Sequence, residues 1–469
     1  MTFVSPTFVF IFLPVVMTVY ALTTKYRRTD LLPIISTAFF VCVNIHDLYS
    51  IIYYFSMAIC AIVAIKLYKA SKKRVWLDIL RVLAALVAVA MIVYRMLFGF
   101  GLIYQWGFVI CLMNIISMCS DILHEQGRVP DSIWEGLIYI TFFPVSLAGP
   151  FVRYGDFTEK LDRADFSLDN FVSGLIRFLI GFVKCVAISA PLEKFYNDVM
   201  VLRDSFGLWV HLLMAAVFGF VIYSFLSGYS DMGRGIALML GIRIDKDFGD
   251  PFVNVTPGDY MRRFFTGFSD FCKHYIVDPV DNIFAKGRFG RFVCCVIGGA
   301  FYVSVFCRSA EVAILLFLPA MAVSFFVMFR PRSKRMKIHT LLKIPCAAIT
   351  FIIMTLVWGV VGLGGIGQVE QSLKHIFETP ASYVSFEALE KLAALKYTLV
   401  PIVAAVLLLL VSCATRERTG SGEKDYTVAE IVVRSVAIVI LILMFVICLT
   451  MLLPQFPNLG TFENGAYFV

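Results

Sequence analysis

A few ionisable side chains interrupt the long apolar runs of this sequence, namely Arg95, Arg177, Lys184, Asp231 and Arg234. A charge inside a membrane-spanning helix costs about 2.5–3.5 kcal/mol or more unless it is paired or hydrated, so each is a candidate functional residue. We expect the alkyl stems of Arg95 and Lys184 to carry their charges to the membrane surface. Asp231 and Arg234 follow the uncharged run 205–230 and, at i, i+3 spacing, can neutralise one another on one helix face.

A second group of polar residues lies in the segment 241–290, where charged and aromatic side chains are interleaved. This segment is too polar to cross a lipid layer and too rich in aromatic residues for a solvated loop. Polar segments at membrane depth are tolerated where they line a cavity or contact protein, so we predict re-entrant or amphipathic helices buried against a bundle. A helix lying on the lipid headgroups is the alternative. His274 is the one histidine in this segment.

The composition indicates which kind of structural element holds these residues in place. The 469-residue chain is 60% hydrophobic and only 16% charged, whereas soluble domains are about 45–50% apolar and about 25% charged. A cytosolic enzyme, a disordered chain and a coiled coil are therefore excluded. The recurring apolar runs predict an all-α integral membrane protein, a polytopic helical bundle of about 11 spans forming one domain over residues 1–469.

Basic clusters beside the apolar runs predict the orientation of this multi-pass protein in the cell (plasma) membrane. By the positive-inside rule, three loops are cytoplasmic and the N-terminus is outside, the first span being uncleaved; the loops are 24–30, 66–74 and 330–337. The net charge of +8 is explained by these clusters, so no nucleic-acid partner is expected. The 12 cysteines show no CxxC spacing, and neither a metal site nor a disulfide is predicted.

Five short segments carry motifs in a fixed order along the chain: FVSPTFVFIFLP at 3–14, TFFPVSLAGPFVRYGDF at 141–157, LSGYSDMGRGIALMLG at 226–241, DYMRRFF at 259–265 and VIGGAFY at 296–302. Together they resemble the membrane-bound O-acyltransferase (MBOAT) family. The similarity is to the bacterial branch that acetylates alginate and other exported polysaccharides or D-alanylates teichoic acids. It implies a bundle with a central tunnel in which an acyl donor and a hydroxyl acceptor meet.

The chain departs from this family at the residues that carry its chemistry. The resemblance places Tyr302 at the position of the catalytic histidine and Phe265 at that of a second family histidine. A tyrosine with a pKa of about 10 is a poor base near pH 7, and loss of a general base removes a factor of about 10²–10⁴ in rate. His274 is the candidate replacement base. The candidate substrate-binding residues are Asp231, Arg234, Arg263 and Arg153, although snorkelling at a helix end is an equal alternative for Arg263.

Two functional hypotheses follow. In the first, the chain transfers an acyl group, acetyl in the simplest case, from a cytoplasmic thioester to a hydroxyl of an exported envelope polysaccharide or polymer. The donor would be acetyl-CoA or acyl carrier protein, with no bound cofactor. In the second, the chain is a catalytically degenerate homologue that acts as an acyl conduit or as a scaffold for an extracytoplasmic partner acyltransferase. A transporter is disfavoured because the sequence has no internal repeat.

Overall fold

A computed structural model describes residues 2–23, 28–43, 48–98, 102–130, 132–147, 149–249, 257–277, 340–363, 366–393, 401, 403–408 and 428–452. The named elements of these parts of the chain are all helices. A single isolated β-bridge joins Phe206 to Val384. The predicted all-α class is therefore confirmed for the described residues.

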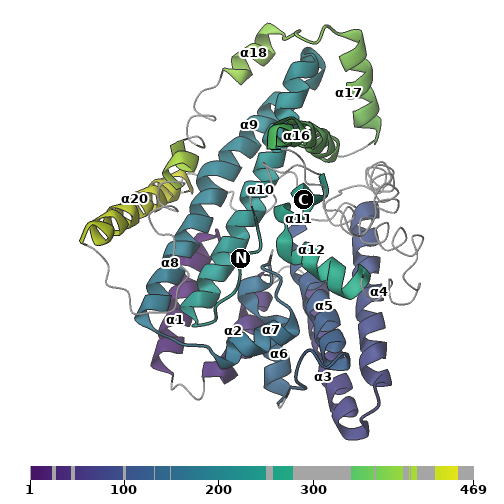
Figure 1. Ribbon diagram of the computed structural model, residues 1–469, viewed down its shortest axis with the longest axis vertical. Helices are drawn as coiled ribbons and strands as arrows, with labels where there is room; N and C mark the ends of the chain where they lie inside the picture. Colours follow the sequence, from purple (N-terminus) through teal and green to yellow (C-terminus); the bar gives the residue numbers. More distant parts are fainter. Residues whose placement is uncertain are drawn as a thin grey trace.

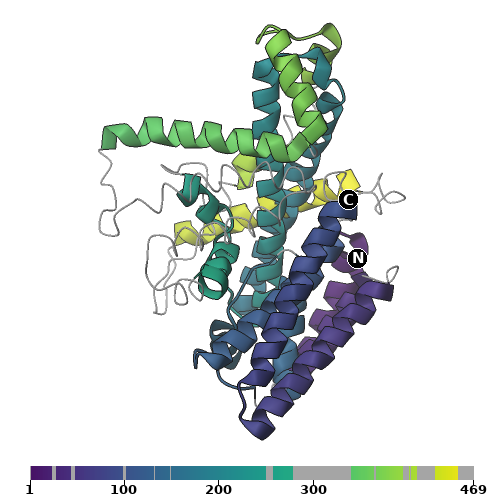
Figure 2. The ribbon, with the colours of Figure 1, turned by 90° about the vertical axis from the view of Figure 1, so that its right-hand side faces the viewer.

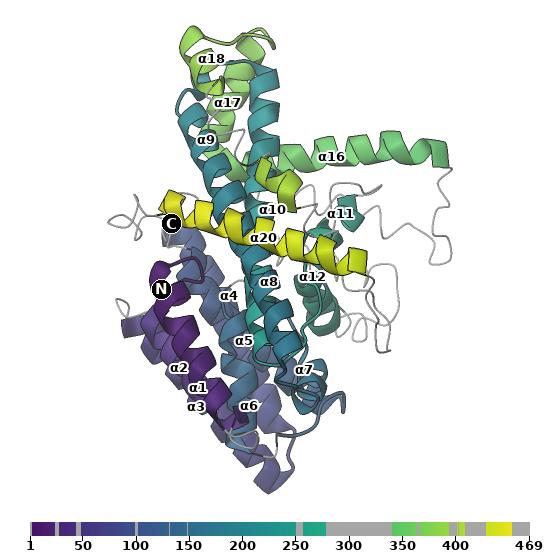
Figure 3. The same cartoon turned by 90° about the vertical axis from the view of Figure 1, so that its left-hand side faces the viewer.

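The N-terminal part of the chain forms antiparallel helices in the lower half of Figure 1. They are η1 (Phe8–Phe12), α1 (Leu13–Leu22), α2 (Arg28–Val43), α3 (Leu48–Ser71), α4 (Val75–Phe98) and α5 (Leu102–Leu123). The α3–α4 turn and the facing ends of α1 and α2 lie toward the same end of the bundle (Figures 1 and 3), as the first two basic clusters require. The side of the membrane that this end faces stays a prediction.

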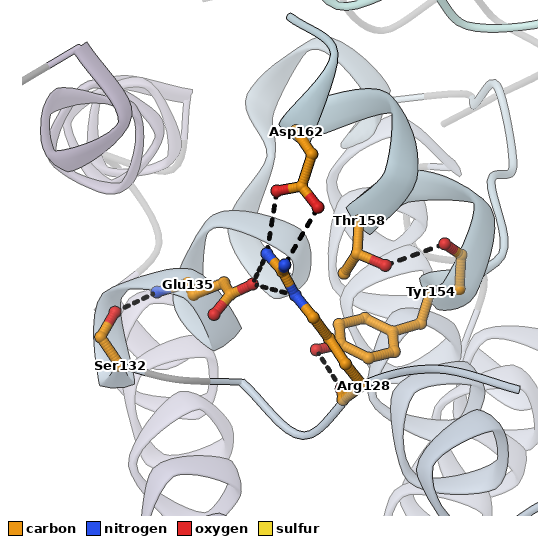
Figure 4. Close-up of polar contacts among 7 residues, drawn as sticks. Arg128, Ser132, Glu135, Tyr154, Thr158 and Asp162 are labelled. Atoms are coloured by element: carbon orange, nitrogen blue, oxygen red, sulfur yellow. Dashed lines mark hydrogen bonds and ion pairs between the residues drawn. The ribbon is translucent and has the colours of Figure 1, made fainter. Parts of the chain in front are cut away.

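The segment after α5 is held by a charged contact. It comprises α6 (Ile133–Thr141), η3 (Phe143–Val145) and α7 (Tyr154–Asp162), and the Ser132 side chain caps α6 by accepting a hydrogen bond from the Glu135 N–H. Figure 4 shows the Arg128 guanidinium between two carboxylates, donating to Glu135 and, at 3.0 Å, to Asp162. The Tyr154 hydroxyl donates to the Arg128 carbonyl at 2.9 Å. These bonds fix the start of α6 and the end of α7 against each other.

Two long antiparallel helical stretches form the centre of the molecule (Figure 1). The first is a continuous run of α8 (Leu168–Val183), η4 (Lys184–Ser189) and α9 (Ala190–Met200), and the second, after η5 (Arg203–Ser205), is α10 (Leu208–Met239). Glycines bring the backbones into contact: a Cβ on Gly174 would lie 2.6 Å from the Gly235 carbonyl oxygen, and one on Gly181 would lie 2.7 Å from the Met232 nitrogen. Small residues allow this close approach between membrane helices.

The later elements surround this central pair. They are α11 (Pro257–Phe264), α12 (Thr266–Cys272), η6 (Lys273–Val277), α16 (Thr340–Leu363), α17 (Ile366–Glu378), α18 (Phe386–Leu392) and α20 (Val428–Leu452). In Figures 2 and 3, α16 and α20 run across the long axis of the α8–α10 pair. The Phe182 ring of α8 contacts Phe445 of α20 at 5.0 Å between ring centres, and a Cβ on Gly359 of α16 would touch Ala215 of α10.

Three described helices are long and apolar enough to cross a membrane: Leu168–Met200, Leu208–Met239 and Pro345–Leu363. Four shorter apolar helices accompany them: Phe8–Leu22, Asp30–Cys42, Ile110–Leu123 and Ser435–Thr450. Large apolar side chains such as Val439 and Leu443 of α20 are exposed, which suits a lipid surface and not water. The predicted total of about 11 spans and the single domain over 1–469 stay predictions.

Candidate functional site

The buried carboxylate of Asp231 on α10 gathers three cations. Its oxygens lie 2.5 Å from Lys184 Nζ, 3.3 Å from Arg234 Nη1 and 3.5 Å from Arg177 Nη1. The predicted i, i+3 pairing of Asp231 with Arg234 is thus confirmed. The other two cations come from the facing stretch, Arg177 on α8 and Lys184 at the first position of η4. The glycine contacts between α8 and α10 bring these side chains within reach.

The cluster lies inside two candidate spans. Asp231 is eight residues from the end of α10, about 12 Å at 1.5 Å per residue. Arg177 is nine residues from the start of α8, about 14 Å. The prediction that Lys184 snorkels to the surface is wrong, because a carboxylate at bonding distance holds the ammonium group at this depth. The Arg95 side chain lies outside the described residues.

The loop that follows α10 is held against that helix by two of its own side chains. The Arg234 Nε donates to the Ile244 carbonyl at 3.2 Å, and the Tyr223 hydroxyl donates to the Gly249 carbonyl at 2.7 Å. Gly241 has a φ of +88°, which an L side chain would strain, and a Cβ there would meet the Asp165 backbone at 2.7 Å. The described part of this loop, up to residue 249, is therefore a fixed part of the bundle.

Asp247, in this loop, is a buried carboxylate that the sequence analysis did not single out. Its residue is 3% exposed, and neither oxygen has a hydrogen-bond partner of good geometry among the described residues. The backbone N–H groups of Phe151 and Gly267 lie close enough to lower its pKa, but desolvation outweighs them and raises the pKa from 3.8 to about 8. The sequence gives little signal for this burial, because Asp247 follows two charged residues, Asp245 and Lys246, and only Phe248 beside it is apolar.

This shift predicts a pH dependence of stability. Because the pKa is raised in the folded chain, the contribution of Asp247 to stability is largest below about pH 4, falls as the pH rises to about 8, and is constant above that. In Asp247→Asn the difference in unfolding temperature from the unmutated protein should grow in favour of the variant from pH 4 to 8. Thermal unfolding in detergent across this range measures that difference.

The control is Glu370→Gln on the exposed side of α17. Lys374 lowers the pKa of the Glu370 carboxyl, so this variant should show a trend of opposite sign, and a weak one because the pair is fully solvated. A difference for Asp247→Asn that is the same at every pH would refute the assignment of the titration to Asp247.

Phe265, at the second family-histidine position, lies in an aromatic cluster. Its ring stacks on Phe248 with centres 4.6 Å apart and contacts Phe151 and Phe268 at 5.3 and 5.5 Å. The predicted burial of Phe264, Phe265 and Phe268 is confirmed, since all three are 0% exposed. The described parts of 241–290 are therefore packed into the bundle, while 250–256 and 278–290 lie outside the described residues. This cluster contributes packing and no proton acceptor.

Arg153 belongs to a separate polar network. Its guanidinium lies 3.6 Å from the Asp121 carboxylate and donates to Gln126 at 2.5 Å. The Tyr275 hydroxyl donates to Asp121 at 2.8 Å and approaches Ser117 at 2.8 Å. This arrangement joins the 141–157 motif to α5 and η6. The Asp121 carboxylate neutralises the charge of Arg153. A structural role for Arg153 is therefore an alternative to the predicted role in substrate binding.

The remaining predicted site residues lie away from the Asp231 cluster or outside the described residues. The Arg263 side chain is exposed on α11, and its backbone carbonyl accepts from the Gly249 N–H at 2.7 Å. His274 lies half-buried on η6, beside Tyr275 of the Arg153 network. Tyr302, at the family's catalytic position, lies outside the described residues. In the described part of the chain, no group of three or more histidine, cysteine, aspartate or glutamate residues could hold a metal ion.

Three motif segments meet around these groups. A Cβ on Gly233, in the 226–241 motif, would strike the Pro144 carbonyl oxygen of the 141–157 motif. Cβ atoms on Gly149 of that motif and on Gly267, just after the 259–265 motif, would both strike the Asp247 carboxylate. The 141–157 and 226–241 motifs and the segment around 259–267 are thus parts of one core.

Comparison with known proteins shows which family this core resembles. The family model MBOAT, membrane-bound O-acyltransferase family, matches residues 124–359. "Probable alginate O-acetylase AlgI" of Azotobacter vinelandii is 28% identical over 163 residues, 34% of this chain and 32% of the relative. "Peptidoglycan O-acetyltransferase" of Helicobacter pylori is 28% identical over 146 residues, 30% of this chain and 28% of the relative.

A third relative, "Teichoic acid D-alanyltransferase" of Bacillus subtilis, is 23% identical over 145 residues, 30% of this chain and 36% of the relative. The chain thus spans about a third of the length of these curated relatives. The family match is broader, since it covers just over half of the chain and contains the 141–157, 226–241, 259–265 and 296–302 motifs. Because this match covers more than half of the chain, the chain belongs to the membrane-bound O-acyltransferase family.

Proposed function

We propose that this protein transfers an acyl group, acetyl in the simplest case, from a cytoplasmic thioester to a hydroxyl of an exported cell-envelope polysaccharide or polymer. Acetyl-CoA or acyl carrier protein is the proposed donor. The observation that carries the proposal is the convergence of three of the motif segments on one core, where Gly149, Gly233 and Gly267 allow contacts that no side chain could replace. Relatives named as O-acetyltransferases of alginate and peptidoglycan support the choice of acceptor.

Acyl transfer requires a group that accepts the proton of the acceptor hydroxyl. Phe265 has no such group and is enclosed by aromatic rings. We assign the hydrogen-bonding role at the reaction centre to the Tyr302 hydroxyl, with His274 as the candidate base. Asp231 and Arg234 are the proposed substrate-binding pair, and Arg263 and Arg153 are the weaker candidates because one is exposed and the other is paired with Asp121.

The burial of Phe265 also favours a second candidate function. A family member whose histidine position is part of an aromatic core can conduct an acyl group or hold an extracytoplasmic acyltransferase without catalysing transfer. In this reading the multi-pass chain, with its N-terminus outside, supplies only the passage through the plasma membrane.

Turnover by the purified full-length chain in lipid nanodiscs distinguishes the two functions. Radiolabelled acetyl-CoA is supplied with an envelope polysaccharide, and label on the polysaccharide is counted. If the chain is an enzyme, Tyr302→Phe should lower the rate about tenfold to 150-fold, the equivalent of about 1.5–3 kcal/mol for a hydrogen bond to a developing charge.

A matched gain-of-function variant completes the test. Tyr302→His combined with Phe265→His restores both family residues and should raise transfer by a factor of about 10² or more if only the base is missing. Transfer by the unmutated chain that is indifferent to Tyr302→Phe and to His274→Ala would contradict the assigned centre. No transfer by any variant, with acetyl-CoA or acyl carrier protein as donor, would favour the conduit or scaffold.

A further inference from the structure

The charges around Asp231 do not balance. Arg177, Lys184 and Arg234 bring three positive charges to one carboxylate, and among the described residues each of the three forms its ion pairs with Asp231 alone. Two positive charges are left over inside the α8–α10 pair. Such an excess is unfavourable within a membrane unless water or an anion reaches it.

The neighbouring carboxylates do not supply the missing charge. Asp245 is paired with Lys160. Asp247 acts on Arg234 only at longer range, since no ion pair joins them in the described chain. Within the described part of the chain, the excess charge therefore stays with the cluster itself.

Part of the cluster is also exposed at the surface of the helix pair. The side chains of Arg177 and Lys184 are 41% and 27% exposed, whereas those of Asp231 and Arg234 are 10% and 14% exposed. Asp231 thus occupies the closed side of the cluster, and the two α8–η4 cations face outward. Lys184 begins a π-helical turn, a local irregularity that often accompanies functional sites in helices.

We propose that Arg177, Lys184 and Arg234 bind a phosphate group at the α8–α10 interface, with Asp231 holding the three cations together. A phosphate monoester carries close to two negative charges and matches the excess of the cluster. The planar guanidinium groups of Arg177 and Arg234 suit bidentate recognition of phosphate oxygens, and the Lys184 ammonium adds a point charge. The phosphate belongs either to a lipid headgroup or to a soluble phosphate compound. Asp231 and Arg234 are also the proposed substrate-binding pair, but phosphate binding here can be measured without acyl transfer.

The test measures phosphate binding by the full-length chain in nanodiscs of neutral phosphatidylcholine. One arm titrates inorganic phosphate by equilibrium dialysis with radiolabel. The other arm exchanges phosphatidic acid into the nanodiscs and counts the molecules retained per chain by mass spectrometry. We expect saturable binding in at least one arm, and the arm that responds identifies the source. Arg177→Gln should weaken that binding at least about tenfold, because one charge-assisted contact is lost.

Arg203→Gln is the matched control, since Arg203 is a partly exposed arginine near the opposite end of α10 that contacts Asp204 and Gln371; its binding should equal that of the unmutated chain. In Arg177→Gln the carboxylate of Asp231 keeps Lys184 and Arg234, so the fold should persist, and thermal unfolding without phosphate verifies it. Arg177→Lys should recover part of the affinity. Absence of binding in both arms, or equal binding by Arg177→Gln and the unmutated chain, would overturn the proposal.

Discussion

Replacing Asp231 with leucine is expected to destabilise the protein by about 3–5 kcal/mol, the cost of removing one partner from a buried ion pair. Three cations within 3.5 Å lose their common carboxylate and are left to repel one another inside the α8–α10 pair. We expect a large fall in the thermal unfolding temperature and loss of the monodisperse peak in size-exclusion chromatography. Lys184→Gln should cost less, because Asp231 retains two partners.

The control for this prediction is Glu370→Leu on α17. That glutamate pairs with Lys374 at 2.7 Å, but the two side chains are 61% and 68% exposed, so its removal should leave the unfolding temperature close to that of the unmutated chain. If Asp231→Leu unfolds at the temperature of the unmutated chain, the cations are stabilised by something other than Asp231, and the account of the cluster given above is wrong.

Introducing leucine at Gly181 is expected to be comparably damaging, by about 3 kcal/mol or more. A Cβ at this position would lie 2.7 Å from the Met232 nitrogen and 2.8 Å from its Cγ, so the helices must separate. Overpacking in a core costs about 1–3 kcal/mol, and more where backbone atoms cannot move aside. Because Lys184 follows Gly181 by less than one turn, separation also pulls the ammonium group away from Asp231. Thermal unfolding and yield after membrane extraction measure the loss.

Gly367→Leu on α17 tests whether this effect is specific to the contact. An added Cβ at Gly367 meets nothing within 4 Å, so the variant should unfold within error of the unmutated chain or slightly above it, since Gly is a weak helix former. Equal losses at the two positions would show that leucine is harmful in any helix of this protein, and the close approach of α8 and α10 would not be the cause.

The Asp231→Leu and Gly181→Leu variants both test the packing of α8 against α10. Gly174 and Gly181 set the distance between α8 and α10, and this distance allows Arg177 and Lys184 to reach Asp231 on the opposite helix. Helix packing here is therefore a condition for the electrostatics of the cluster. A double variant of Gly181→Ala with Lys184→Gln should show a smaller total loss than the two single variants add up to, because both weaken the same contact.

Local features of the sequence determined much of what the structure contains. The apolar fraction of 60% leaves a lipid-embedded helical protein as the one consistent class, since water could not solvate such a surface. The pairing of Asp231 with Arg234 follows from helical spacing alone. Interleaved aromatic residues predicted the burial of Phe264, Phe265 and Phe268, because side chains of that size are stable in neither water nor a solvated loop.

Only the tertiary structure decided how the remaining charges are neutralised. Lys184 and Asp231 are 47 residues apart, and Arg153 and its carboxylate partner Asp121 lie on separate elements, so no local pattern distinguishes these pairs from snorkelling or solvated side chains. The pKa of Asp247 is likewise raised by burial, which depends on how segments distant in the sequence pack around it. The energy of a charge depends on what lies within a few ångströms of it, and those neighbours are fixed by helix packing, which the order of residues along one helix does not specify.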